Sequence, residues 1–271
     1  MPGSETAKRL AGLETIMREA GELARETSRG DFKRWTKGAD HSPVSDGDIA
    51  VNNFLRARLA VLAPEAAWLS EETEDDLANR NNRLGTASAW VVDPIDGTRA
   101  YIAGRHDWTI SVALVEHNRP RLAALYAPVT DEMFLATAGG GATLNGAAIA
   151  ASRGSGLVGA KLAGPKRYLE RLDHLVPGAI AQSRIFSLAL RLTRVADGQL
   201  DMAFASPGSQ DWDLAAADLL VHEAGGAMTD LTGQSLRYNQ PHTVHGALIA
   251  AGPARHANVI ELVRDRLTEF A

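Results

Sequence analysis

The stretch Trp90-Val91-Val92-Asp93-Pro94-Ile95-Asp96-Gly97-Thr98 decides how the rest of this 271-residue chain is interpreted. Its first three residues are apolar and predict a short buried strand that ends at Asp93. Asp96 follows three residues later, across a backbone stiffened by Pro94, so both carboxylates can converge on one point. Two carboxylates that close repel each other unless a proton or a cation lies between them. The stretch therefore predicts either an ordinary aspartate-rich turn or part of a cation site.

The residues after this turn favour an anion-binding helix end. Gly97 permits a close backbone approach, and Thr98 followed by Arg99-Ala100-Tyr101-Ile102 can begin a helix. The first N–H groups of a helix have no partner inside it and attract anions. An N-cap without any ligand is the alternative interpretation.

Three further segments place an acid beside a predicted strand end or helix start. They are Ser70-Glu71-Glu72, Trp212-Asp213 and Pro43-Val44-Ser45-Asp46-Gly47-Asp48. Each has a structural explanation by itself, because acids stabilise helix N-termini and Ser45 with Asp48 matches a capping box. Together they predict a carboxylate cluster at one edge of a layered fold. Ligation by carboxylates without His or Cys selects a hard cation such as Mg²⁺, and a cation beside an anion-binding helix end indicates phosphate-ester chemistry.

Composition excludes several other classes of protein. With 45% apolar residues, 23% charged residues and no cysteine, the chain is typical of a globular protein without disulfides, thiolate metal sites or cysteine nucleophiles. Lys and Arg total 28 against 33 Asp and Glu, without a basic tract, so we do not expect nucleic-acid binding. No signal peptide or apolar run of about 20 residues is recognisable, which predicts a cytoplasmic protein without a membrane contact. The net charge of −5 does not exclude an anionic substrate, since a cation would offset the acids at the predicted site.

Hydrophobic periodicity predicts an α+β chain in two parts. Helices are expected over 6–27, 45–62, 168–176, 187–196, 212–224 and 254–270. Strands are expected over 67–69, 90–92, 158–163, 200–205 and 248–251, and the strands 109–115, 122–127 and 133–137 predict an antiparallel meander. The Ser- and Gly-rich residues 151–159 predict a boundary between an α+β metal-binding subdomain, 1–150, and an α/β subdomain, 151–271.

Two other patterns do not indicate function. Residues 154–159 match G-x-G-x-x-G but precede a predicted strand instead of opening a helix, so a dinucleotide fold is rejected. His242 and His245 lie in a polar, proline-containing segment without a third ligand, which predicts surface histidines and no metal site.

Taken together, the acidic motifs resemble those of the inositol monophosphatase family of Mg²⁺-dependent, lithium-sensitive phosphatases. The resemblance runs from Ser42 to Gly252 and includes 70–72, 93–98, 212–213 and Glu223-Ala224-Gly225-Gly226. It implies the layered αβαβα sugar-phosphatase fold, commonly a homodimer, and a phosphoric monoester hydrolase acting on a small phosphorylated metabolite.

The resemblance also implies a set of metal ligands. One Mg²⁺ would be held by Glu71, Asp93 and the carbonyl of Ile95. A second would be held by Asp93, Asp96 and Asp213.

Further roles implied by the resemblance concern the reacting groups. Glu71 and Thr98 would position the water nucleophile, and the amides of Gly97 and Thr98 would bind the phosphate. Asp48 would help to place a third, weaker Mg²⁺ through water. A transition state that spreads charge over phosphoryl oxygens is stabilised by cations and helix N–H groups, so these roles are physically consistent.

The resemblance defines the substrate less closely than it defines the metal ligands. The segments 99–102, 108–114 and 125–128 are more similar to the CysQ-like 3′(2′),5′-bisphosphate nucleotidases, although those carry Lys-Glu-Phe where this chain has Arg99-Ala100-Tyr101. Inositol-selective members carry an acid six residues before the Trp of Trp-Asp, where this chain has Ser206. Arg99 and Ser206 are thus candidate substrate contacts, with Arg105 and Lys166 as further cationic candidates for a second phosphate.

Several alternatives to a nucleotidase remain open. Among enzymes they are inositol-1-monophosphatase, histidinol-phosphatase and fructose-bisphosphate hydrolysis. The alternative of another class is a metal-dependent regulatory or binding protein, against which the complete set of acids and Thr98 argues.

Overall fold

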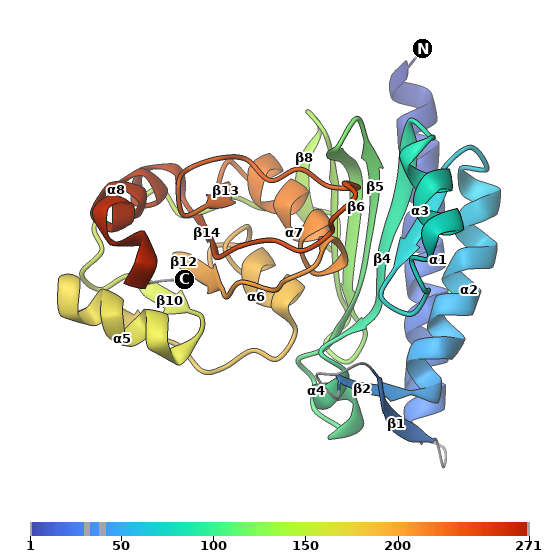
Figure 1. The fold of residues 1–271 in the computed structure, drawn as a ribbon, viewed down its shortest axis with the longest axis horizontal. Helices are drawn as coiled ribbons and strands as arrows, with labels where there is room; N and C mark the ends of the chain where they lie inside the picture. The colour runs from blue at the N-terminus through green and yellow to red at the C-terminus, as the bar shows by residue number, and fades with distance from the viewer. Residues whose placement is uncertain (1, 30–32, 38–41, 270–271) are drawn as a thin grey trace.

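Helices and sheets alternate in five layers in the computed structural model, which describes residues 2–29, 33–37 and 42–269. α1 (Pro2–Arg29) and α2 (Asp46–Leu62) form one outer layer against a seven-stranded sheet (Figure 1). α6 (Leu188–Thr193) and α7 (Asp211–Glu223) separate that sheet from a five-stranded sheet, whose far side is covered by α5 (Lys166–Leu175) and α8 (Pro253–Val263). The predicted αβαβα fold is confirmed.

The larger sheet contains the predicted meander. Its order is β3-β4-β5-β6-β7-β8-β9, in which β3 and β4 are parallel and all other neighbours are antiparallel. These strands are β3 (Ala67–Ser70), β4 (Ser88–Asp96), β5 (Thr109–Glu116), β6 (Arg119–Ala127), β7 (Glu132–Thr137), β8 (Gly141–Leu144) and β9 (Ala147–Ala148). Every residue of β4 is buried, because helices cover both faces of the sheet, and this explains its uninterrupted apolar run from Ala89 to Val92.

The smaller sheet has the order β11-β10-β12-β14-β13. It consists of β10 (Lys161–Ala163), β11 (Ile180–Ala181), β12 (Met202–Ala205), β13 (Ala227–Asp230) and β14 (Leu248–Ala251). β10 is parallel to both β11 and β12, and β14 is antiparallel to β12 and β13. The predicted strand over 158–163 was too long, since residues 157–159 form a turn before β10.

Other differences from the predicted elements lie near the ends of the chain and around the site. The predicted closing helix ends at Val263 and continues as a 3₁₀ segment over Arg264–Glu269, while its last predicted residue lies outside the described part. The hairpin of β1 (Arg34–Lys37) with β2 (Ser42–Ser45), and helix α3 (Leu77–Leu84), were not predicted. α4 (Thr98–Ile102) begins where predicted. No helix in the described ranges combines the length and apolarity needed to cross a membrane.

α7 lies at the centre of the main hydrophobic core. Its residues 214–221 are all buried, because the two sheets enclose it. Three consecutive alanines, Ala215–Ala217, allow close packing on both sides. The start of α7 is therefore held firmly relative to β4. The division of the chain at 151–159 remains a prediction.

Candidate active site

Three of the predicted carboxylates meet where β4 ends and α7 begins. Asp93, Asp96 and Asp213 each offer an oxygen atom, and these oxygens lie within 4.8 Å of one another. Asp93 is 1% and Asp96 6% exposed. The pairing of β4 with β5 shifts register between Asp93 and Asp96, so one extra residue of β4 lies opposite β5. Such a bulge lets residues three apart face the same side of the strand.

The charge of this cluster is unfavourable without a cation. Burial raises the pKa of Asp93 well above its usual range, and the neighbouring carboxylates of Glu71, Asp96 and Asp213 raise it further. Burial, followed by the charge of Asp96, likewise raises the pKa of Asp213 well above its ordinary value. Burial raises the pKa of Asp96 to about 6, against the opposing effect of its hydrogen bonds. Oxygen ligands that repel one another in a buried site suit a hard divalent cation.

Asp96 also fixes the start of α6. The sequence predicted a helix here, but it did not predict the contact of this helix with Asp96. Its carboxylate accepts hydrogen bonds from Ser187 Oγ at 2.5 Å, from Leu188 N at 3.1 Å and from Ala189 N at 2.6 Å. A residue of the first sheet thus fixes a helix of the middle layer. The position of α6 and that of the carboxylate cluster depend on each other.

The three clustered aspartates line a cavity with a volume of about 330 Å³. Glu71 lies on the wall of this cavity. Glu71 N donates to Val92 O at 3.2 Å, which fixes the start of its loop beside β4. Its side chain forms an ion pair with Lys37 Nζ at 3.1 Å, and Lys37 also contacts Glu72 Oε1 at 2.5 Å. Glu71 is therefore beside the three-aspartate cluster and paired with a lysine that the sequence did not single out.

Thr98 connects the cavity to Asp48. Thr98 Oγ1 lies 3.0 Å from Asp48 Oδ1 and 3.1 Å from Ile95 O, and Ile95 and Thr98 both line the cavity. Asp48 lies behind Thr98 and accepts from Ser45 N at 2.8 Å and Ser45 Oγ at 2.6 Å. The capping interaction predicted for Ser45 and Asp48 is present. Asp48 does not line the cavity itself, and its carboxylate lies one hydrogen bond behind the wall, on the hydroxyl of Thr98.

Gly97 requires the freedom that only glycine has. Its φ is +92°, and a Cβ there would lie 3.1 Å from Ser187 N and 3.3 Å from Asp107 O. The backbone can therefore turn sharply from β4 into α4 and bring the first amides of α4 to the cavity.

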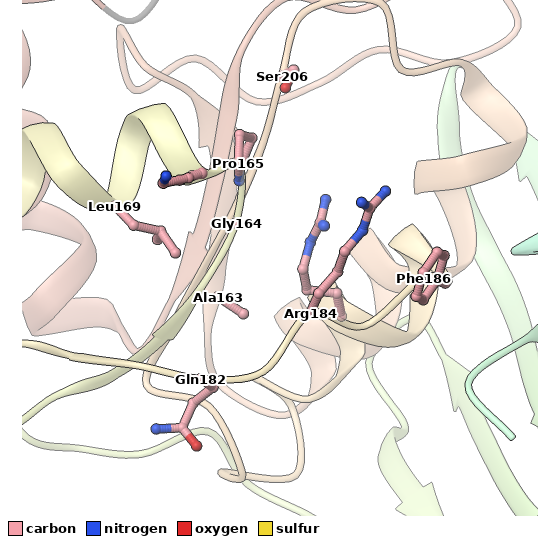
Figure 2. A pocket seen from close by; sticks show the side chains of 10 residues that line it. Ala163, Gly164, Pro165, Leu169, Gln182, Arg184, Phe186 and Ser206 are labelled. Carbon is pink, nitrogen blue, oxygen red and sulfur yellow. The ribbon is translucent and has the colours of Figure 1, made fainter. Parts of the chain in front are cut away.

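A second cavity of about 560 Å³ adjoins the first, since Arg184 and Phe186 line both. Figure 2 shows Arg184 between Phe186 and the segment Gly164–Pro165. Of the predicted substrate contacts, Arg99 lines the first cavity, and Ser206 and Lys166 line the second.

Arg105 lines neither cavity. It forms an ion pair with Asp107 at 2.9 Å and stacks over Phe186 at 4.8 Å from the ring centre. The sequence did not identify Arg184, Phe186 or Arg191. A usable signal was present, because Arg191 interrupts the apolar run of the predicted helix 187–196.

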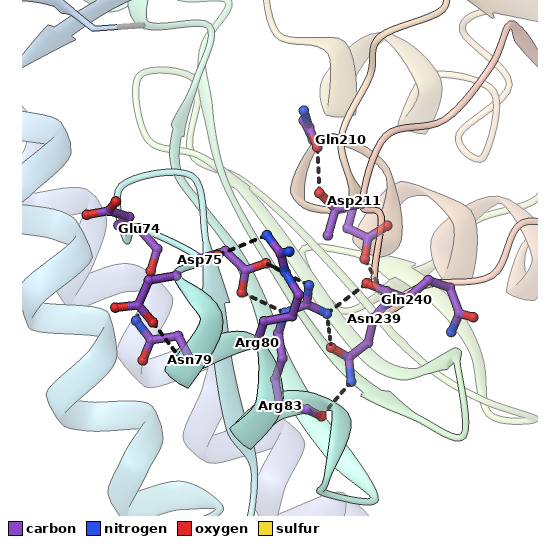
Figure 3. A network of polar contacts seen from close by, with 11 residues as sticks. Glu74, Asp75, Asn79, Arg80, Arg83, Gln210, Asp211, Asn239 and Gln240 are labelled. Carbon is purple, nitrogen blue, oxygen red and sulfur yellow. Dashed lines mark hydrogen bonds and ion pairs between the residues drawn. The ribbon is translucent and has the colours of Figure 1, made fainter.

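A buried polar network connects the two segments that carry Glu71 and Asp213 (Figure 3). Arg83 is completely buried and donates to Asp75 at 2.8 and 2.7 Å and to Asn239 Oδ1 at 3.0 Å. Asn239 N in turn donates to Asp211 Oδ2 at 2.6 Å. Asp75 follows Glu71 in the same loop, and Asp211 begins α7 two residues before Asp213. The network therefore fixes one segment relative to the other.

The prediction of a surface role was wrong for His245. Its side chain is 11% exposed, and His245 Nε2 lies 2.7 Å from Asp211 Oδ1. Asp211 thus has a polar partner on each carboxylate oxygen, Asn239 N and His245 Nε2, and both contacts help to hold the start of α7.

Comparisons with known proteins agree with this geometry. The model of the inositol monophosphatase family matches residues 6–268. An inositol monophosphatase 3 of Solanum lycopersicum is 34% identical over 80% of this chain and 83% of its own length. The Nus factor SuhB of Salmonella typhimurium is 33% identical over 93% of this chain and 94% of its own. The solved structure of a Thermotoga maritima IMPase superimposes with a TM-score of 0.82 at 24% identity, covering 97% of this chain and 100% of that one.

Proposed function

This chain belongs to the inositol monophosphatase family and is a phosphoric monoester hydrolase, and we propose that it uses Mg²⁺ to hydrolyse a small phosphorylated metabolite. The observation that carries the proposal is the buried cluster of Asp93, Asp96 and Asp213, whose oxygens lie within 4.8 Å of one another. Its raised pKa values mark a site that a cation would stabilise.

The proposed ligand sets are those that the family resemblance implies, and the cluster of Asp93, Asp96 and Asp213 oxygens supports one of them. Asp93, Asp96 and Asp213 would hold one Mg²⁺, and Asp93 with Glu71 and the Ile95 carbonyl would hold another on the wall of the same cavity. A third, weaker site would involve Asp48 and Glu71. When bound, Mg²⁺ supplies a lowered pKa for an attacking water and positive charge for the phosphoryl oxygens.

The residues of the chain orient the reactants. Thr98 Oγ1 is fixed by Asp48 and Ile95 O, so it can hold the attacking water together with Glu71. The amides of Gly97 and Thr98, at the sharp turn into α4, can donate to phosphate oxygens. The ion pair with Lys37 Nζ, at 3.1 Å, holds the side chain of Glu71 in place at the cavity wall.

The names of the relatives favour an inositol phosphate as substrate. The relatives described above include inositol monophosphatases and no nucleotidase, so they do not support the CysQ-like nucleotidase predicted from the sequence and favour its alternative, an inositol-1-monophosphatase. Cytoplasmic location and a homodimer are retained as predictions.

The test is phosphate release from a panel of monoesters, including inositol 1-phosphate, histidinol phosphate and adenosine 3′,5′-bisphosphate. We expect turnover with Mg²⁺, none with EDTA, and inhibition by Li⁺. Asp213→Asn should abolish turnover, whereas Arg56→Leu, an exposed arginine on α2, should retain it. If no phosphomonoester is hydrolysed in a Mg²⁺-dependent way, the proposed function is wrong.

A second candidate function is a metal-dependent regulatory or binding protein. The observation favouring it is the 33% identity to a protein named a Nus factor. Inactivity on the whole panel, together with Mg²⁺-dependent thermal stabilisation, would favour this candidate.

A further inference from the structure

We propose that Tyr101 is a positioning residue for the proposed hydrolysis and acts through the hydrogen bond between Thr98 and Asp48. This inference rests on the proposed phosphatase function, in which Thr98 holds the attacking water at the cavity wall. Tyr101 does not line that cavity, so it reaches the reaction only through its neighbours. The residue that makes room for its side chain is Gly47.

Thr98 and Tyr101 connect α4 to the start of α2 by two contacts. Thr98 is the first residue of α4 and Tyr101 the fourth, and residues three apart in a helix point to the same side. Thr98 Oγ1 lies 3.0 Å from Asp48 Oδ1, and the side chain of Tyr101 faces Gly47, the residue before Asp48. The contact of Tyr101 with Gly47 therefore sets how closely the two helices approach where Thr98 meets Asp48.

Gly47 is required for space and not for backbone conformation. It is buried in the first turn of α2, and its φ lies outside the left-handed region. A glycine lowers the stability of a helix relative to alanine. However, a Cβ at this position would lie 2.8 Å from Cζ and 2.9 Å from Cε1 of Tyr101, and closer still to the hydroxyl oxygen. Non-bonded carbon atoms prefer about 3.5–4.0 Å, so an alanine here would push α2 away from α4.

The side chain of Tyr101 is held against Gly47 by two other residues. Its ring makes an edge-to-face contact with Trp108, with ring centres 5.0 Å apart and planes at 84°. Its hydroxyl donates to Ala24 O on α1 at 2.8 Å. Tyr101 is only 2% exposed, so the ring has no open space into which it could turn. A displacement at Gly47 would therefore move the helices and not only the ring.

The hydroxyl of Tyr101 lies close enough to Asp48 to sense its charge. Burial raises the pKa of Tyr101, and the negative charge of Asp48 raises it further. The hydroxyl therefore stays protonated at neutral pH and remains a donor to Ala24 O. Removing this hydroxyl changes no charge beside the pair of Thr98 and Asp48, so any effect on the reaction reports a change of position.

The first experiment is a double-mutant cycle on phosphate release at saturating Mg²⁺, with the monoester of the panel that is hydrolysed fastest. Gly47→Ala should lower kcat roughly tenfold or more with KM unchanged, because a misplaced Thr98 affects the attacking water and not substrate binding. Tyr101→Phe removes only the hydroxyl and should lower kcat roughly threefold. The double variant should regain roughly threefold or more of the activity that Gly47→Ala loses, because the hydroxyl oxygen is the atom nearest to the new Cβ.

Two matched controls make the same changes away from the site. Tyr126→Phe removes a buried tyrosine hydroxyl that donates to Asp131 Oδ1 at 2.9 Å, and Gly12→Ala places a Cβ against the end of the Leu62 side chain. Both should keep the kcat of the wild type. Circular dichroism at the assay temperature shows whether each variant is folded. If Gly47→Ala does not fold, a wild-type kcat in Tyr101→Phe would by itself overturn the inference.

The second experiment does not require turnover. Crystal structures of the wild type and the variants, grown in EDTA, give the separation of Thr98 Oγ1 from Asp48 Oδ1, which is 3.0 Å in the wild type. In Gly47→Ala, or in Tyr101→Phe if the former does not fold, we expect this separation to exceed the hydrogen-bond limit of about 3.5 Å. In the double variant it should be shorter than in Gly47→Ala.

The two experiments separate failure of this inference from failure of the proposed function. A wild-type kcat in Gly47→Ala and Tyr101→Phe, or a loss in Gly47→Ala that the double variant does not reduce, would overturn the role of Tyr101 while the phosphatase activity stands. Absence of all turnover, with a separation of Thr98 from Asp48 that changes as expected, would overturn the phosphatase proposal and leave the positioning by Tyr101. Absence of turnover with an unchanged separation would overturn both.

Discussion

The metal-free protein should lose stability as the pH rises, and Asp96 should contribute a measurable part of the loss. Burial raises the pKa of Asp96 to about 6, from an ordinary value of 3.8. The folded protein therefore binds this proton more tightly than the unfolded chain does. The stabilisation is fully present below about pH 4 and is lost as the pH rises through about 6.

The magnitude follows from the difference in pKa. About 2 pKa units correspond to about 3 kcal/mol in the free energy of unfolding, of which about 2 kcal/mol falls between about pH 4.5 and about pH 7.5. Urea unfolding in EDTA at these two pH values measures it. Asp96→Asn lacks the titrating group, so its free energy of unfolding should fall by about 2 kcal/mol less than that of the wild type. Arg56→Leu should follow the wild type. Equal pH dependence in Asp96→Asn and wild type would refute the reasoning.

Three further predictions concern the support of the site. Arg83→Met should lower the free energy of unfolding by about 3–5 kcal/mol, because it leaves buried partners unpaired; a loss below about 1 kcal/mol in chemical denaturation would contradict this. Gly97→Ala should lose most phosphate release, because the Cβ approaches Ser187 N at 3.1 Å; Gly104→Ala, also at positive φ but in open space, is the matched control and should stay active. Mg²⁺ should raise the thermal midpoint of the wild type but not of Asp96→Asn, and an equal rise in both would count against Asp96 as a ligand.

The fold could be predicted where the sequence carries long periodic or apolar patterns. α1 and α2 follow from helical spacing, and β4 to β7 follow from apolar runs separated by turn residues. The hairpin of β1 and β2, and the short strands β9 and β11, have two to four residues each. Such strands are too short to show a period, even where the partner is next in the chain, as β2 is for β1 and β8 is for β9.

The positions of the carboxylates in the site could be predicted from local sequence patterns. The residues that contact them from other segments could not. The acids follow strand ends or begin helices, so their local sequence indicates where they lie. Ser187 and Arg184 reach the site because α6 and the segment before it pack between the two sheets, which no local pattern encodes. Arg191 alone left a signal, since it interrupts the apolar run of the predicted helix 187–196. His245 shows the same limit, since its polar segment folds back onto the start of α7.

The three small alanine side chains in the middle of α7 set the distance between the helix and the two sheets. This distance in turn determines how far apart the clustered aspartates lie. One sheet carries two of the clustered aspartates, and the enclosed helix carries the third. A bulkier side chain at Ala216 would have to push a sheet away from the helix, and Asp213 would then move relative to Asp93. Larger residues at these alanines are therefore disfavoured by the geometry of a site that the alanines do not contact. Such substitutions should reduce the affinity for the cation before they unfold the protein.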